Sequence, residues 1–242
     1  MVAQILIPTQ SYEDWRRLLA RPDRHWKAGF SAMTLARSWE AADGFPPEVG
    51  EIFLSSDQTQ LLAIEPLLVI PEYQIPLPGG RRASQTDVFV LARSPRGLVA
   101  IAVEGKVDEA FGPTVAERRL DNSEGVAVRL KFLLECLGMS DVPGSIRYQL
   151  LHRAASAIIA AQQYFASHAV MLVHSFSSTD RWFDDFAAFA GLFKRTPKIG
   201  ELVTLGSCGG VELHIGWCKG NQKFREDAFP TSSGSGEAAT SS

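Results

Sequence analysis

The chain has 242 residues, of which 45% are hydrophobic and 21% charged, and its formal net charge is −3. This composition is ordinary for a globular protein, and the length suffices for one large domain or two small ones. Proteins that bind nucleic acid by charge alone are usually basic, so the charge balance counts against that class. It leaves open an enzyme that holds phosphate groups through metal ions.

The sequence pattern does not favour a membrane or secreted protein. No apolar run reaches the ~18–20 residues that a membrane helix requires. The N-terminal segment lacks the basic start and the long apolar stretch of a secretory signal. We therefore expect a cytoplasmic protein without a membrane partner. Its three cysteines have no paired short spacing, so we expect reduced thiols rather than a disulfide framework or a zinc knuckle.

Hydrophobic periodicity predicts an alternation of helices and strands. Pro71 and Pro76 confine the first strand to an edge of the sheet or to bulged geometry. The two hairpin strands that follow are apolar on both faces, which is typical of central strands. In chain order we expect a short helix at 11–19, a helix at 31–42, a strand at 67–77, hairpin strands at 86–93 and 98–106, helices at 123–137 and 147–165, a strand at 169–176, an aromatic helix at 180–193 and a strand at 211–218.

This order of elements predicts an α/β (α+β) fold in which helices flank a mixed central sheet. A single domain over residues 1–229 fits the order better than two separate cores. Residues 230–242 are small and polar, and they cannot bury enough apolar surface to offset the entropy of ordering them. We expect a disordered tail there.

The most informative feature is the hairpin, because each of its strands carries one acidic residue. The sequence Ser-Pro-Arg-Gly at 94–97 fits the residue preferences of a type I turn. A hairpin that is symmetric about this turn pairs Arg93 with Leu98. The same register places Asp87 opposite Glu104.

Two opposed carboxylates need a positive partner. Directly opposed residues have Cβ atoms roughly 4.5–5.5 Å apart, and like charges at that distance repel. A divalent cation is the obvious candidate to lie between Asp87 and Glu104. Lys106 points to the same face as Glu104, because strand side chains alternate with a period of two. The pattern indicates a metal-assisted hydrolysis site, or else a solvated sheet rim on which Lys106 neutralises Glu104.

The pattern Asp87…Glu104-Gly105-Lys106, on two hairpin strands between a leading helix and a helix–strand pair, resembles the PD-(D/E)xK nuclease superfamily. This resemblance spans residues 30–176 and implies a restriction-endonuclease-like core. Longer phrases at 77–87, 103–109, 147–153 and 173–177 resemble an uncharacterised bacterial branch of that superfamily.

The resemblance implies a metal-dependent nuclease that acts on nucleic acid, with DNA favoured over RNA. Asp87 and Glu104 would bind Mg²⁺ or Mn²⁺, and the carbonyl of Gly105 would be a further ligand. Lys106 would orient or deprotonate the attacking water. Hard oxygen ligands suit Mg²⁺, and a bound cation lowers the pKa of water. Thr86 stands where the superfamily's name has proline.

Three further residues are candidates by the same resemblance. Superfamily members often add an acid from the first core helix, and Glu40 fits that place, although an ordinary surface glutamate fits equally. Some branches have a glutamine on the helix after the motif, which Gln149 would match, and Gln149 or Arg153 would steady the substrate. Arg153 lies on the same face one turn later, where it could hold a phosphate or pair with an acid.

The alternative from another class is a nuclease-like fold that serves as an interaction or regulatory module without catalysis. The net acidity favours it, and the intact set of two acids and a lysine counts against it. Other chemistries are weaker. The five histidines are scattered without a pair at ligand spacing, and the sequence contains no GxSxG elbow and no phosphate-binding loop.

Overall fold

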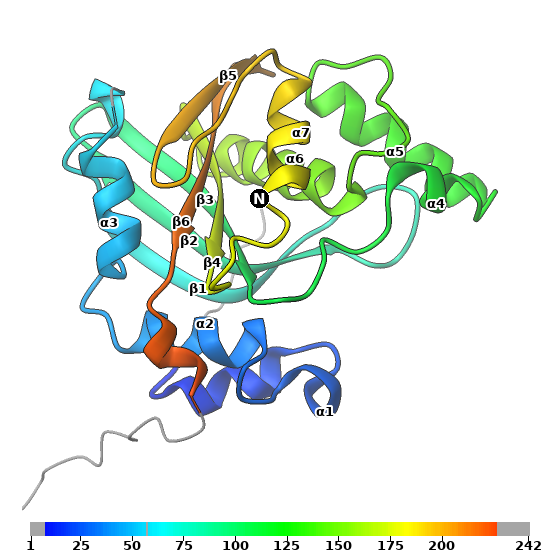
Figure 1. The fold of residues 1–242 in the computed structure, drawn as a ribbon. Helices are drawn as coiled ribbons and strands as arrows, with labels where there is room; N and C mark the ends of the chain where they lie inside the picture. Colours follow the sequence, from blue (N-terminus) through cyan, green and yellow to red (C-terminus); the bar gives the residue numbers. More distant parts are fainter. Residues whose placement is uncertain (1–7, 57, 227–242) are drawn as a thin grey trace, which may run out of the picture.

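The computed structural model describes residues 8–56 and 58–226. At its centre is a six-stranded mixed sheet in the order β1-β2-β3-β4-β6-β5 (Figure 1). The predicted mixed α/β fold, with helices flanking the sheet, is confirmed. The strand around Pro71 was expected at an edge or in bulged geometry; it is the edge strand β1, and Pro76 directly follows it. The strands are β1 (Glu65–Ile75), β2 (Ser84–Ser94), β3 (Gly97–Lys106), β4 (His168–Ser175), β5 (Leu202–Cys208) and β6 (Val211–Lys219).

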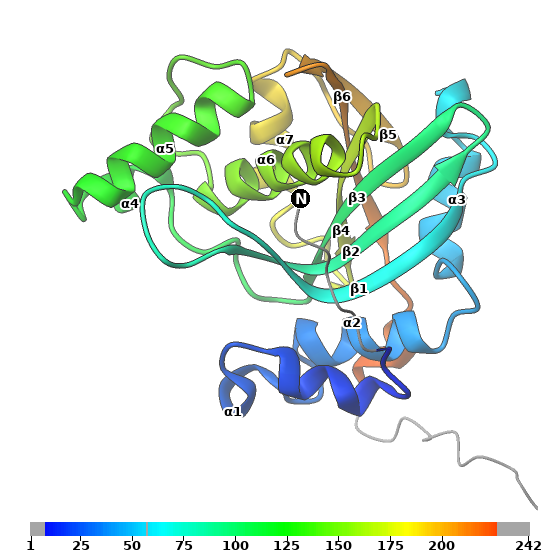
Figure 2. The same cartoon turned by 180° about the vertical axis from the view of Figure 1, so that it is seen from behind.

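Helices cover both faces of this sheet (Figure 1 and Figure 2). The longest, α6, packs across β2, β3, β4 and β6 on one face, whereas α2 and α3 contact β3 and β6 from the other. Each face has its own buried apolar cluster. The helices are η1 (Tyr12–Leu18, 3₁₀), α1 (Pro22–His25), α2 (Ser31–Glu40), α3 (Pro47–Leu54), η2 (Thr59–Leu61, 3₁₀), α4 (Val115–Arg119), α5 (Glu124–Cys136), α6 (Tyr148–Gln163), α7 (Phe183–Gly191) and η3 (Gln222–Arg225, 3₁₀).

The hairpin register agrees with the sequence prediction. Arg93 pairs with Leu98 across the turn, and the antiparallel ladder runs back to the pair Val88 and Val103. Beyond the hairpin, β3 pairs with β4 and β4 with β6 in parallel, which makes the sheet mixed. Helix α6 lies against both hairpin strands, β2 and β3.

On the opposite face of the sheet, α2 packs very closely against the C-terminal end of β3. A Cβ atom built on Gly105 would lie 2.9 Å from Cδ2 of Leu35 in α2. Only a residue without a side chain lets α2 lie this near to the strand. Gly105 stands between Glu104 and Lys106, so the packing of α2 also holds the backbone that carries those two side chains.

Several elements differ from the sequence prediction. Helix α3 was not among the expected elements; it begins at Pro47, since proline is tolerated at the first position of a helix. The aromatic helix begins at Phe183 rather than Asp180, after Trp182 in a left-handed conformation with φ 70°. The expected tail at 230–242 lies outside the described residues. Among the helices that the structure describes, none combines the length and apolar character needed to cross a membrane.

Candidate active site

The hairpin brings Asp87 and Glu104 to the same end of two neighbouring strands. The ladder ends at Val88 and Val103, and the next register position holds Asp87 and Glu104. Oδ2 of Asp87 accepts a hydrogen bond from the backbone N–H of Gly105 at 2.8 Å. This bond crosses the hairpin and fixes the orientation of the Asp87 carboxylate.

Lys106 and Gln149 share one oxygen of Glu104. Nζ of Lys106 lies 2.7 Å from Oε1 of Glu104, and Nε2 of Gln149 donates to the same oxygen at 2.6 Å. Oε1 of Gln149 accepts from Lys106 at 3.2 Å. Lys106 and Glu104 are each only 3% exposed. The structure thus brings the predicted helix glutamine together with the acid and lysine of the hairpin.

Arg153 lies against both carboxylates. Its Nε donates to Oε2 of Glu104, and its Nη2 lies 3.7 Å from Oδ1 of Asp87. Nη1 donates to Oγ of Ser84 at 3.1 Å. Of the two roles that the sequence left open for Arg153, pairing with an acid is the one that these contacts display. The positive group expected between the carboxylates is therefore a guanidinium in this structure.

A third acid, Glu72 of β1, belongs to the same cluster and was missed by the sequence analysis. On β1 and β2, Pro71 pairs with Val88 and Tyr73 with Thr86, so Glu72 is level with Asp87. Its φ of 53° lies in the left-handed region, which is unusual for a residue with a side chain. The available signal was an acid inside an apolar strand, but the register of a strand with two prolines cannot be read from the sequence.

The pKa values of the three acids shift in different directions: two are raised and one is lowered. Burial, together with the charge of Glu104, raises the pKa of Asp87 to about 7. Burial and the charge of Asp87 raise the pKa of Glu72 well above its usual value. Burial alone would also raise the pKa of Glu104, but the charges of Arg153 and Lys106 outweigh it and lower that pKa to about 2.

These pKa shifts indicate that the cluster has fewer positive than negative groups. Three carboxylates lie near two cations, so a proton on one of the acids or a further cation would balance the charge. Asp87 keeps 23% of its side chain exposed, against 4% for Glu104, and is therefore the open side of the cluster.

The structure does not bring Glu40 into this cluster. At the end of α2, its Oε1 accepts hydrogen bonds from Nε1 of Trp15 at 2.6 Å and from Oγ1 of Thr9 at 2.5 Å. It lines a separate cavity of about 270 Å³ beside Pro66 and Pro71 of β1. These two hydrogen bonds connect the segment around η1 to the end of α2.

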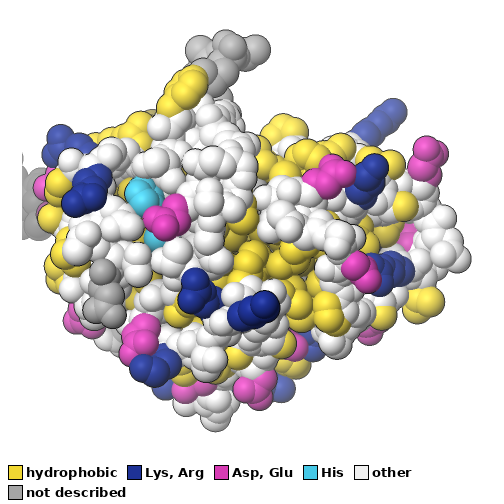
Figure 3. Space-filling view, turned by 90° about the horizontal axis from the view of Figure 1, so that it is seen from above, with side chains coloured by type: hydrophobic (Ala, Val, Ile, Leu, Met, Phe, Trp, Pro, Cys, Tyr) yellow, Lys and Arg dark blue, Asp and Glu magenta, His cyan; other side chains and the backbone are white. Residues whose placement is uncertain are grey.

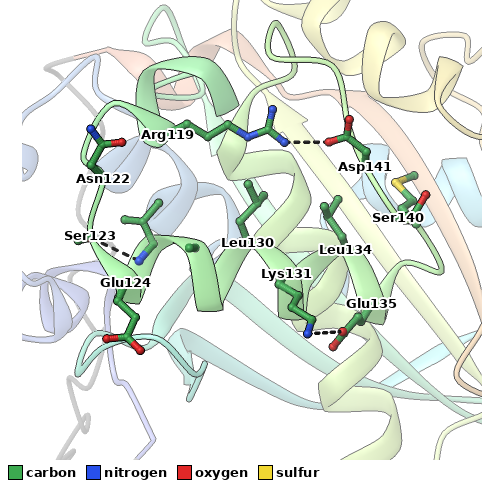
Figure 4. A pocket seen from close by; sticks show the side chains of 13 residues that line it. Arg119, Asn122, Ser123, Glu124, Leu130, Lys131, Leu134, Glu135, Ser140 and Asp141 are labelled. Carbon is green, nitrogen blue, oxygen red and sulfur yellow. Dashed lines mark hydrogen bonds and ion pairs between the residues drawn. The ribbon is translucent and has the colours of Figure 1, made fainter.

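A larger cavity, of about 620 Å³, lies along α4 and α5 and contains none of the clustered acids (Figure 4). Leu130 and Leu134 of α5 line it, and an ion pair between Arg119 and Asp141, with 2.9 Å between Nη2 and Oδ1, crosses its rim. Charged side chains such as Glu124 and Lys131 line it beside these leucines, but none of the site residues predicted from the sequence does.

Comparison with known proteins adds one match. Residues 8–222 match a family described as Domain of unknown function (DUF6946). Neither the curated proteins nor the solved structures gave a match.

Proposed function

We propose that this chain, which belongs to the DUF6946 family, a domain of unknown function, is a cytoplasmic, metal-dependent nuclease of the PD-(D/E)xK type. Its reaction would be hydrolysis of phosphodiester bonds, with DNA the preferred substrate. The observation that carries the proposal is the buried contact of Glu104 with Lys106 and Gln149, directly beside Asp87 on the neighbouring hairpin strand.

The donor set fits a hard divalent cation. Mg²⁺ and Mn²⁺ prefer carboxylate and carbonyl oxygens, and Mg²⁺ binds few protein ligands while keeping several waters. Asp87 and Glu104 would hold the ion with the carbonyl of Gly105, and the shortage of positive charge gives a reason for it to bind. A bound ion would lower the pKa of a water molecule and offset charge on the phosphate.

The ligands differ in how freely they can bind a cation. A carboxylate offers about four lone-pair sites. Glu104 already accepts from Lys106, Gln149 and Arg153, whereas Asp87 accepts one short hydrogen bond, from the backbone of Gly105. Asp87 is thus the more open ligand. Arg153 keeps Glu104 ionised, which is the form that a metal ion requires.

Lys106 would act on the nucleophile and on the phosphate. Gln149 and Glu104 hold its ammonium group at 3.2 and 2.7 Å, so the charge is positioned before a substrate arrives. From this place it would orient the attacking water and stabilise the negative charge that develops on the phosphate. Groups that are fixed in advance need no reorganisation during the reaction.

The test is a cleavage assay on duplex DNA, single-stranded DNA and RNA, with Mg²⁺, Mn²⁺ or EDTA. We expect metal-dependent cleavage, strongest on DNA, that falls roughly 10²-fold or more in Lys106→Met. Lys131→Met is the matched control, because Lys131 is 79% exposed and pairs only loosely with Glu135, at 3.8 Å. Inactivity on all three polymers, or full activity in Asp87→Asn, would remove the proposal.

One observation favours a second candidate, a nuclease-like module without catalysis. Arg153 occupies Oε2 of Glu104, and the Glu104–Lys106 pair is almost fully buried. A protein of this kind would keep the ion pairs as core structure and would not cleave. Cleavage by the pure protein that depends on Lys106 would exclude it.

A further inference from the structure

A second group of polar side chains lies at the other end of the sheet. Nδ1 of His168 lies 3.1 Å from Nε2 of His214 and 3.3 Å from Oε2 of Glu212. Nε2 of His214 lies 3.6 Å from the same oxygen of Glu212. Two imidazole nitrogens and one carboxylate oxygen thus form a nearly equilateral triangle.

The strand pairing creates this triangle from residues that are far apart in the sequence. His168 opens β4 and pairs with Glu212 of the parallel strand β6. His214 follows Glu212 by two positions, so both side chains point to the same face. The backbone N–H of Glu212 donates to the carbonyl of Ser167 at 2.9 Å, which holds the two strand beginnings together. The sequence analysis found no histidine pair at ligand spacing, and the parallel pairing that brings these two together cannot be read from residue spacing.

We propose that His168, Glu212 and His214 bind a Zn²⁺ ion, with the fourth position open to water. A tetrahedral zinc ion has bonds of about 2.0–2.1 Å, so its ligand atoms stand about 3.3–3.4 Å apart. The three measured edges, 3.1, 3.3 and 3.6 Å, bracket that spacing. Two histidines and one carboxylate suit zinc or a related transition metal rather than Mg²⁺.

One tautomer of His214 leaves the three atoms of the triangle with more lone pairs than hydrogen atoms. Oγ1 of Thr204, which pairs with His214 across β5 and β6, lies 2.9 Å from Nδ1 of that ring. When the Nδ1–H donates to this hydroxyl, Nε2 presents a lone pair to the triangle. Nε2 of His214 and Oε2 of Glu212 are then two acceptors facing each other; the Nδ1–H of His168 lies between them, and the amide of Gln60 reaches only Glu212. A divalent cation satisfies all three atoms.

The surroundings resemble those that orient metal ligands. The Thr204 hydroxyl fixes the ring of His214, and Nε2 of Gln60 in η2 donates to Oε2 of Glu212 at 3.3 Å. Such outer hydrogen bonds set the direction of a ligand and its basicity. The pairing of β5 with β6 shifts register between Thr204 and Gly206, so β5 is locally irregular directly beside Thr204.

The triangle is open to solvent on one side and separate from the acidic cluster. The side chains of His168 and Glu212 are 12% and 36% exposed, while His214 is fully buried. On the surface seen from above, a histidine and an acidic side chain lie next to each other (Figure 3). Glu104 is level with Val173 of β4, five residues after His168, which is roughly 17 Å along the strand.

The experiment measures Zn²⁺ uptake by the full chain in an Asp87→Asn background, so that the acidic cluster contributes little. Protein stripped with EDTA is titrated with Zn²⁺ against a chromophoric chelator, and with Co²⁺ while its visible spectrum is recorded. We expect one equivalent of Zn²⁺ and a Co²⁺ spectrum typical of four-coordination. His168→Gln and Glu212→Gln should each weaken binding by more than 10²-fold, and Thr204→Val by about 10-fold.

His25→Gln is the matched control, because His25 is an exposed histidine of α1. It should leave the uptake and the Co²⁺ spectrum unchanged. Glu212 is partly exposed, so Glu212→Gln should fold normally, and circular dichroism verifies this. The proposal is overturned if no equivalent of Zn²⁺ binds, or if uptake is the same in His168→Gln and Glu212→Gln as in the parent.

Discussion

Nε of Arg153 donates to Oε2 of Glu104, while Nη2 of the same guanidinium lies 3.7 Å from Oδ1 of Asp87. One side chain of α6 therefore neutralises the ends of both hairpin strands. Arg153 and Glu104 are almost fully buried and Asp87 is partly buried, so the energy of the cluster depends on the balance of its charges. That balance leads to predictions on stability as well as on activity.

Removal of Arg153 should be costly because it leaves a buried carboxylate without its main partner. We expect Arg153→Met to lower the free energy of unfolding by about 3–5 kcal/mol, as measured by urea denaturation. Glu104→Gln in the same background should restore part of the loss, since the uncompensated charge is then gone. Equal stability of the single and the double variant would show that Arg153 acts through packing alone.

The stability of the metal-free protein should depend on pH through Asp87. In the folded state its pKa is about 7, above the usual 3.8, with Glu72, Glu104, Lys106 and Arg153 around it. Between about pH 4 and 7 the folded protein holds a proton that the unfolded chain releases, so this contribution to stability falls as the pH rises. Glu104 has the opposite sign, and its contribution is lost as the pH falls from 4.5 towards 2.

Asp87→Asn isolates the first of these effects. In the presence of EDTA, the variant should lose much of the decline in stability between pH 4 and 7 and should be more stable than the wild type at pH 8. Urea denaturation at a series of pH values measures this. An unchanged slope would mean that the carboxyl of Asp87 is not protonated in the folded state.

Substitutions of Glu40 distinguish its structural role, the contact with Trp15, from the metal-binding role that the resemblance implies. Glu40→Ala leaves Nε1 of Trp15 without its 2.6 Å partner and should cost about 1–3 kcal/mol of stability. Glu40→Gln keeps an acceptor and should cost less. Both variants should retain cleavage at temperatures where they are folded. Loss of cleavage in a stable Glu40→Gln protein would return this residue to the list of metal ligands.

Gly105 tests the contact between α2 and the backbone of the site. Gly105→Ala places a Cβ atom 2.9 Å from Leu35 and should lower stability by about 1–3 kcal/mol. Leu35→Ala makes room for the new methyl group, so the glycine substitution should cost less in that background. Thermal denaturation of the four proteins in this cycle measures the coupling between the two sites. Purely additive effects would contradict the close contact.

Features set by local sequence could be predicted, whereas features set by distant pairing could not. The turn at 94–97 defined the hairpin register, and the helical spacing of Gln149 and Arg153 placed both on the face that meets Glu104. Glu72 escaped notice because a left-handed residue in a proline-containing edge strand follows no simple alternation. The position of Glu40 depends on Trp15, a contact between separate helices for which the sequence offers no spacing rule.

The central claim is that the acidic cluster captures a divalent cation, and Mn²⁺ calorimetry tests it most directly. The titration uses His168→Gln, which disables the second site, at pH 8, above the pKa of about 7 of Asp87. It is run with and without a non-cleavable DNA oligonucleotide. We expect at least one equivalent of Mn²⁺ to bind, and this binding to disappear when Asp87→Asn is added. No uptake under either condition, or equal uptake in the Asp87→Asn protein, would contradict the account.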